Sequence, residues 1–201
     1  MKRQSTTTDV ALVAAFAALI AVAAILPAIK TGVGVPVTLQ TFAVLLAGAC
    51  LGPVRGFLAV CLYLLGGIAG LPIFSGGGSG IGHFTGITAG YLVGFAFAAA
   101  LCGWIVQRNR TRATDFSLVF TAGLLSSAVF IHALGILGMM WRGDLSLSAA
   151  FSADVVFFPG DILKNVAMAL VATSVHRAFP DLLARRSPAT APAAEPATAE
   201  V

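Results

Sequence analysis

Six long apolar segments that are almost free of charge dominate the chain. They run over approximately residues 9–29, 36–52, 54–70, 85–107, 116–141 and 155–177. Charged residues make up only 10% of the 201 residues, whereas soluble domains have about 25%. In lipid, a segment of about 20 apolar residues must satisfy its backbone polar groups internally, as a helix does. The sequence therefore predicts an all-α integral membrane protein with six transmembrane helices.

Basic residues between these segments are distributed unevenly. If the N-terminus is cytoplasmic, nine of them fall on the cytoplasmic side and only two on the outer side. The nine are Lys2, Arg3, Arg55, Arg108, Arg110, Arg112, Arg177, Arg185 and Arg186, and the two are Lys30 and Arg142. Cytoplasmic loops carry such an excess, so both termini are predicted to be cytoplasmic. The net charge of +4 is scattered rather than gathered in a patch, which does not favour binding to nucleic acid.

The two ends of the chain differ from its apolar middle. Lys2 and Arg3 precede an apolar run, as in a signal peptide, but the uncharged run from Val10 to Ile29 is longer than the usual apolar core and more spans follow it. We expect an uncleaved first helix. The end of the chain is rich in proline and alanine, which is typical of disorder. The expected organisation is a cytoplasmic segment at 1–8, one six-helix membrane domain at 9–178 and a disordered cytoplasmic tail at 179–201.

The remaining basic residue, Lys164, lies inside the sixth segment, three residues after Asp161. Residues three apart share a helix face, and Pro159 suits a first helical turn. A charge at mid-membrane costs about 2.5–3.5 kcal/mol on insertion scales. The pair either holds this helix against a neighbouring helix or forms a polar ligand site. We favour the ligand site because the predicted orientation puts it near the outer face, where a nutrient arrives.

Residues 66–94 are rich in glycine, and their first part, the glycine-rich stretch at 66–86, connects the third and fourth segments. It lacks the Gly-Lys-Ser/Thr end of a phosphate-binding loop. Its core at 75–82 is expected to be a mobile loop that presents backbone N–H groups to an anion, closes over a ligand or merely connects two helices. Gln40 and Tyr91 either line a pocket or play ordinary interfacial and core roles. The candidate ligand contacts are Asp161, Lys164, Gln40, Phe74, Ser75, Gly76, Gly77, Ser79 and Tyr91.

Small residues recur at four-residue spacing, which lets membrane helices pack closely. Two such glycine series are interpreted as packing faces: Gly48, Gly52 and Gly56, and Gly86, Gly90 and Gly94. In the first segment, Ala11/Ala15, Ala14/Ala18 and Ala17/Ala21 form faces without a polar side chain. These faces either pack inside the bundle or dock on another membrane protein.

Cysteine and histidine give no sign of a metal site or of catalysis. Cys50, Cys61, Cys102, His83 and His132 have no partner at metal-ligand spacing and are interpreted as structural. A lone histidine, lone cysteines and an Asp–Lys pair are a poor catalytic constellation. The chain is therefore not expected to be an enzyme.

Four motifs, in this order, resemble the BioY family of biotin-transport proteins, which are S components of energy-coupling-factor (ECF) transporters. They are Val-Pro-Val-Thr-Leu-Gln at 35–40, Gly-Leu-Pro-Ile-Phe-Ser-Gly-Gly at 70–77, Gly-Ile-Thr-Ala-Gly-Tyr-Leu-Val-Gly-Phe at 86–95 and Pro-Gly-Asp-x-x-Lys at 159–164. The resemblance covers roughly residues 8–178. At 86–91 the family usually has Gly-Pro-Thr-Gly-Gly-Tyr, and the missing proline bears on how the fourth helix begins.

The resemblance implies a bacterial cytoplasmic-membrane protein that captures biotin with high affinity at its outer side. It also implies a transmembrane coupling subunit and two cytoplasmic ATPase subunits as partners, which supply the ATP hydrolysis. Ala11, Ala14, Ala15 and Ala18 match the family's docking face for the coupling subunit. No cofactor is implied, because biotin is the transported ligand.

Biotin combines a ureido ring, an apolar thiophane ring and a carboxylate. We hypothesise that Asp161 accepts from the ureido N–H groups and Lys164 donates to the ureido oxygen, while Ser75, Ser79 and nearby backbone N–H groups hold the carboxylate. The rival pose places Lys164 on the carboxylate. Another vitamin as the ligand and an ion-coupled secondary transporter stay open, although the sequence shows no internal repeat of the kind typical of the latter.

Overall fold

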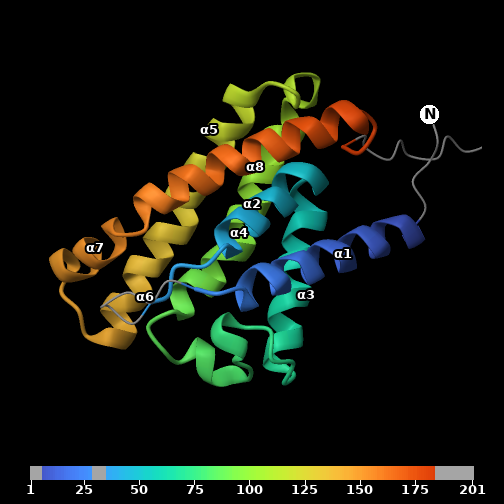
Figure 1. The fold of residues 1–201 in the computed structure, drawn as a ribbon. Helices are drawn as coiled ribbons and strands as arrows, with labels where there is room; N and C mark the ends of the chain where they lie inside the picture. Colours follow the sequence, from blue (N-terminus) through green and yellow to red (C-terminus); the bar gives the residue numbers. More distant parts are fainter. Residues whose placement is uncertain (1–5, 29–34, 184–201) are drawn as a thin grey trace, which may run out of the picture.

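The computed structural model describes residues 6–28 and 35–183, and this part of the chain is helical, without a β-strand (Figure 1). The α-helices are α1 (Thr6–Ile25), α2 (Gln40–Leu51), α3 (Pro53–Ile68), α4 (Ala89–Arg108), α5 (Phe116–Ser126), α6 (Ala133–Gly143), α7 (Leu147–Val155) and α8 (Phe158–Ala178). Short 3-10 helices lie at η1 (Ser75–Gly77), η2 (Ile81–Phe84) and η3 (Arg110–Arg112), and a π-helical turn, η4 (Ser127–His132), joins α5 to α6. The predicted all-helical class is confirmed.

Each predicted apolar segment contains a helix, but the helices differ in length. Among the described residues, α1, α4 and the continuous helix from Phe116 to Gly143 are long and apolar enough to cross a membrane, and α7 with α8 adds a fourth span if this pair, bent by 50°, counts as one. α2 and α3 are shorter, with 12 and 16 residues. Residues 1–5, 29–34 and 184–201 lie outside the described residues, and with them most of the predicted cytoplasmic segment at 1–8 and of the predicted tail at 179–201.

The start of the sixth predicted segment differs from the structure. A separate helix, α7, begins at the cap Ser146, whose hydroxyl accepts from the backbone N–H of Ala149 at 3.3 Å. The chain then bends, and α8 begins at Phe158 with Pro159 in its first turn. Proline fits there because its missing N–H is not needed for an intrahelical bond. The bend places Asp161 in the first turn of α8, as expected from the sequence.

α2 is the central helix of the bundle. All of its residues except Phe42 are buried, and it packs against α1, α3, α4 and α8. Its closest approach to α4 is at Gly48, where a Cβ atom would overlap the backbone carbonyl oxygen of Ala99. Gly48 therefore lies on a packing face, as predicted. Gly86 does not, because a Cβ atom there would meet nothing within 4 Å.

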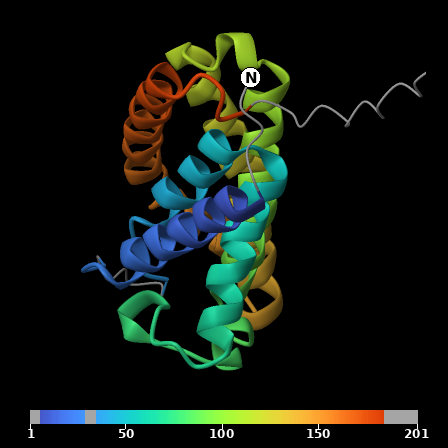
Figure 2. The same cartoon turned by 90° about the vertical axis from the view of Figure 1, so that its right-hand side faces the viewer.

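Arg55 connects several elements at one end of the bundle. Its guanidinium donates to Asp9 of α1 at 3.1 Å and to the carbonyl oxygens of Leu51 at 2.9 Å and Leu182 at 2.6 Å. The start of α1, the turn between α2 and α3 and the residues after α8 therefore lie together, an arrangement that can be followed in Figure 2.

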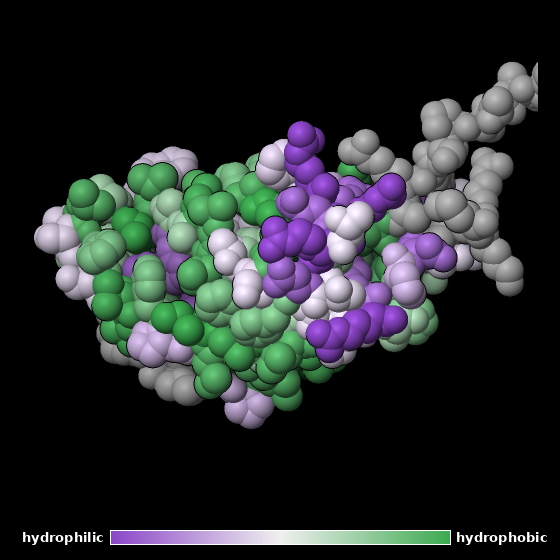
Figure 3. Space-filling model, turned by 90° about the horizontal axis from the view of Figure 1, so that it is seen from above, coloured by the Kyte–Doolittle hydropathy of each residue, from purple (hydrophilic) through white to green (hydrophobic). Residues whose placement is uncertain are grey.

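The surface of the molecule is unevenly polar. On the face that is seen from above in Figure 3, hydrophilic side chains gather towards one side and apolar side chains cover most of the rest.

The connection from α4 to α5 lies outside the apolar segments. Asp115 caps α5 by accepting from the backbone N–H groups of Ser117 at 2.9 Å and Leu118 at 3.5 Å. Its other carboxylate oxygen accepts from Arg112 at 2.7 Å, and this bond, with the backbone bonds, lowers the pKa of Asp115 below its usual value. The exposed loop thus carries its own local hydrogen bonds and starts α5 at a defined residue.

The glycine-rich stretch was expected to be a mobile loop, and the structure gives it two short helical turns, η1 and η2. Phe74 anchors it: the side chain is 1% exposed and lies edge-on to the rings of Tyr63 and His83, with centroids 5.6 and 4.9 Å away. Gly76 and Gly77 have φ angles of 74° and 77°, a left-handed conformation that glycine adopts without strain.

The close contact of α2 with α4 gives a stability prediction. Gly48→Ala places a methyl group against the carbonyl oxygen of Ala99, and overpacking of this kind typically costs about 1–3 kcal/mol. We expect a lower unfolding temperature of the detergent-purified protein. Gly160→Ala is the control, because a Cβ atom at Gly160 meets nothing within 4 Å. Equal unfolding temperatures of the two variants would contradict the packing.

Candidate ligand-binding site

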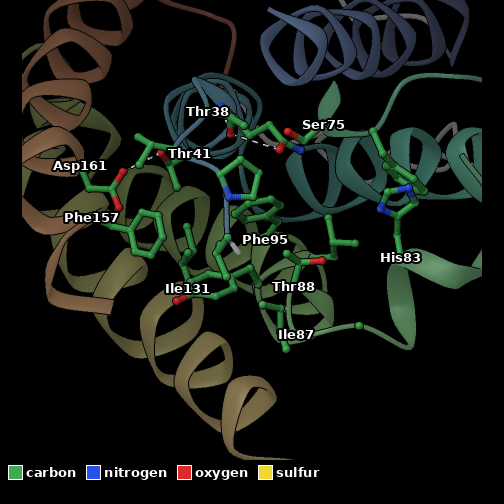
Figure 4. A pocket seen from close by; sticks show the side chains of 18 of the residues that line it. Thr38, Thr41, Ser75, His83, Ile87, Thr88, Phe95, Ile131, Phe157 and Asp161 are labelled. Atoms are coloured by element: carbon green, nitrogen blue, oxygen red, sulfur yellow. Dashed lines mark hydrogen bonds between the residues drawn. The ribbon is translucent and has the colours of Figure 1, made fainter. Parts of the chain in front are cut away.

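A cavity of about 360 Å³ lies between α2, α4, α8 and the glycine-rich stretch. Cavities of this volume are within the range that binds small molecules. Figure 4 shows Asp161, Thr41 and Phe157 on one side of the cavity and Ser75 and His83 on the other. The lining residues are Val35, Pro36, Val37, Thr38, Gln40, Thr41, Phe74, Ser75, Gly82, His83, Gly86, Ile87, Thr88, Tyr91, Leu92, Phe95, Ile131, Phe157, Asp161 and Lys164.

Asp161 and Lys164 form a direct ion pair in the cavity wall. Lys164 Nζ lies 2.8 Å from Asp161 Oδ1, and both side chains are only 12% exposed. The pairing confirms that the two residues share one face of a helix. Thr41, near the start of α2, joins them: its hydroxyl donates to Asp161 Oδ1 at 2.9 Å and accepts from Lys164 Nζ at 3.3 Å. The pair therefore connects α8 to α2 and also presents charge to the cavity.

Gln40 lies in the first turn of α2, next to this pair. Its side-chain nitrogen donates to the hydroxyl of Tyr63 at 2.8 Å, and its side-chain oxygen accepts from Thr38 at 3.2 Å. Gln40 and Tyr63 are 5% and 1% exposed. The amide is thus held in one orientation by two neighbours. One N–H of the amide remains for a ligand, because a glutamine amide has two.

The opposite side of the cavity is formed by the glycine-rich stretch and the start of α4. Phe74, Ser75, His83 and Thr88 line this side. Of the predicted contacts in the stretch, Phe74 and Ser75 line the cavity, whereas Gly76, Gly77 and Ser79 are not among its lining residues. Space is open at the positions that Cβ atoms of Gly76 and Gly77 would take, since an added Cβ atom there would meet nothing within 4 Å.

Tyr91 lines the cavity with its ring and points its hydroxyl elsewhere. The hydroxyl donates to Asp154 Oδ1 at 2.7 Å. Asp154 is fully buried at the end of α7 and also lies 2.9 Å from His132 Nδ1. The other ring nitrogen of His132, Nε2, lies 3.5 Å from Asp161 Oδ2. A second layer of ionisable groups therefore stands behind Asp161.

Sequence reasoning missed Asp154 and Thr41, and it interpreted His132 as structural without giving it a partner. One signal was present: an ionisable residue within an apolar segment is a functional candidate by default. That signal applies to His132, but Asp154 falls just before the expected start of the sixth segment. Asp154 follows His132 by 22 positions in the sequence, and this separation conceals the contact because no helical spacing connects the two residues.

The fold and the cavity define an α-helical membrane protein with a buried site for a small ligand that has polar groups. Comparison with known proteins narrows this class. The chain belongs to the BioY family, whose model matches residues 1–181.

Two relatives support this assignment, and one solved structure shares the fold. The chain is 40% identical over 191 residues to the biotin transporter BioY of Rhodobacter capsulatus, covering 89% of this chain and 98% of that protein. It is 36% identical over 184 residues to the biotin transporter BioY of Rhizobium etli, with the same coverage of 89% and 98%. A crystal structure of the S-component for biotin from an ECF-type ABC transporter has a TM-score of 0.82 at 24% identity, covering 88% of this chain and 95% of the other. The last match concerns the fold.

Proposed function

We propose that this chain is the biotin-capturing S component of an ECF-type ABC transporter. The observation that carries the proposal is the Asp161–Lys164 pair, which is 12% exposed and stands in the wall of a cavity of about 360 Å³. The names of the relatives supply the ligand, since proteins 40% and 36% identical to this one are biotin transporters.

The pair suits the ureido group of biotin. That group has two N–H donors and one carbonyl acceptor, which complement the Asp161 carboxylate and the Lys164 ammonium. The apolar rings of Tyr91, Phe95 and Phe157 would contact the thiophane ring. The biotin carboxylate would then lie on the far side, at Ser75 and the open backbone near Gly76, Gly77 and Ser79. In the rival pose the biotin carboxylate binds Lys164.

Six membrane crossings complete the proposal. They are α1, α2, α3, α4, the continuous α5–α6 helix and α8 with the bent α7. α2 and α3 are about 18 and 24 Å long at 1.5 Å per residue, shorter than a hydrocarbon core of about 30 Å. With an even number of crossings and more basic residues on the cytoplasmic side, the end of the bundle around Arg55 is cytoplasmic and the cavity faces outward, in the bacterial cytoplasmic membrane.

Energy must come from partner subunits in this proposal, because the chain is a substrate-binding subunit rather than an enzyme. The partners are a transmembrane coupling subunit and two cytoplasmic ATPase subunits. The alanine face of α1 supports docking, because Ala11, Ala14, Ala15 and Ala18 are all exposed in the structure. Small side chains allow another helix to approach closely within a membrane.

Loss of either charge should weaken biotin binding by the detergent-purified chain. Removing one partner of a buried charge pair costs about 2–5 kcal/mol, which is roughly 30-fold to several-thousand-fold in the dissociation constant. We expect Asp161→Ala and Lys164→Ala to fall in this range in a calorimetric titration. Asp181→Ala is the matched control, since Asp181 is exposed beyond α8 and should leave binding unchanged.

Two outcomes would speak against this assignment in different ways. Nearly unchanged affinity in both charge variants would remove Asp161 and Lys164 from the site. A folded wild-type protein that binds no biotin would remove biotin as the ligand, and a screen of other vitamins would follow.

The alanine face of α1 gives a separate prediction. Ala15→Trp places a bulky side chain on the proposed docking face, so biotin uptake by cells carrying the whole transporter should fall at least about tenfold. Biotin binding by the isolated chain should remain. Leu137→Trp on the exposed side of α6 is the control and should spare both. Normal uptake by the Ala15→Trp variant would place the docking surface elsewhere.

A further inference from the structure

Asp154 is a carboxylate without any exposure to solvent. Its oxygens lie 2.9 and 3.0 Å from His132 Nδ1, and one of them accepts from the Tyr91 hydroxyl at 2.7 Å. Within residues 6–28 and 35–183, His132 is the one residue able to carry positive charge that is in ion-pair contact with Asp154. A buried carboxylate needs a charged partner or must take up a proton. The ionisation of Asp154 is therefore tied to His132.

His132 has a carboxylate at each ring nitrogen. Nδ1 lies 2.9 Å from Asp154 Oδ2, and Nε2 lies 3.5 Å from Asp161 Oδ2. A neutral imidazole would turn one lone pair towards a carboxylate, whereas an imidazolium donates on both sides. The ring of Phe158 lies over the imidazole with centroids 4.5 Å apart, and an aromatic face attracts a cation.

The charge count of the cluster agrees with this assignment. The ionisable groups around His132 are Asp154 from α7, Asp161 and Lys164 from α8 and Tyr91 from α4. With His132 charged, two carboxylates face two cations and the cluster is neutral. With His132 neutral and both carboxylates ionised, one negative charge remains in a region of low dielectric, which is costly.

We propose that His132 is an imidazolium, anchored by Asp154, that acts as a positioning residue for the ligand-binding carboxylate of Asp161. This deepens the proposed function and rests on it for the identity of the ligand. Oδ1 of Asp161 already accepts from Lys164 and Thr41, and Oδ2 faces His132. A carboxylate has about four acceptor positions, so one on Oδ2 remains for a ligand N–H. The same anchoring occupies the hydroxyl of Tyr91, so Tyr91 meets the ligand with its ring.

Nitrogen-15 NMR of the ring nitrogens in the full, ligand-free, detergent-purified chain tests the charge directly. The chain has three histidines, so His132 is assigned from spectra of the His83→Gln and His176→Gln variants. At about pH 7.5, where an ordinary histidine is mostly neutral, we expect both ring nitrogens of His132 to be protonated. A spectrum with one unprotonated nitrogen would overturn the proposal, because the ring of His132 would then be neutral.

A double-mutant cycle on biotin affinity tests the positioning role. His132→Gln alone leaves two carboxylates facing one lysine, and we expect binding to weaken by about 10–100-fold. In an Asp154→Asn background the cluster is neutral without a charged ring, so the same substitution should cost about threefold or less. His176→Gln is the control, because this buried histidine bonds the carbonyl oxygen of Ala49 instead. An equal cost in both backgrounds would indicate packing alone and overturn the positioning role.

The two measurements keep this proposal separate from the proposed function. If the wild-type chain binds no biotin, the assigned ligand is wrong, while the NMR measurement still decides the charge of His132. If the His132→Gln and Asp154→Asn variants do not fold, the charge of His132 is still decided by the ring signals of the wild-type chain, which are assigned with the His83→Gln and His176→Gln variants. If biotin binds but His132 is neutral, the function stands and this inference fails.

Discussion

The carboxylate of Asp161 is the point on which the site depends. It joins three parts of the bundle. It accepts a hydrogen bond from Thr41 on α2, forms an ion pair with Lys164 on its own helix and lies close to His132 in the π-helical turn. A charge that is 12% exposed between apolar helices persists only with such partners. Packing and polarity are therefore coupled here: α8 can occupy its place against α2 only where the carboxylate finds these groups. π-Helical turns inside α-helices often occur at functional sites, and this one brings His132 to Asp161.

The short central helix explains where the cavity lies. α2 has 12 residues and packs against α4 at Gly48, so its position along the bundle is determined by backbone contact. If α2 is one of the proposed membrane crossings, its length of about 18 Å would leave the rest of a hydrocarbon layer of about 30 Å without helix on the side of Gln40. Residues 35–38 and the glycine-rich stretch border this space. The cavity thus lies beyond the first turn of α2, and the polar side chains of Gln40 and Thr41 at the start of this helix line it.

The sequence was sufficient for the parts of the structure that depend on local periodicity. Apolar length predicted the helices, and the three-residue spacing of Asp161 and Lys164 predicted a shared face, which the 2.8 Å contact confirms. Contacts between distant residues were beyond it. Spacing does not reveal that Thr41 meets Asp161 across 120 residues, nor that α7 is a helix separate from α8 and bent from it by 50°. For the same reason the sequence did not reveal that, of the predicted contacts in the glycine-rich stretch, only Phe74 and Ser75 border the cavity.

The two sides of the cavity differ in how firmly they are held, and this bears on affinity. On one side Gln40, Thr41 and Asp161 each already have protein partners, so a ligand meets groups whose orientation is set before it arrives. Such preorganisation lowers the entropy lost on binding. On the other side, only Phe74 and Ser75 of residues 74–79 line the cavity, and the positions that Cβ atoms of Gly76 and Gly77 would take have no other heavy atom within 4 Å, so the cavity is less closely bordered there. The firm side therefore suits recognition of a polar head group, and the open side suits a ligand tail of varying position.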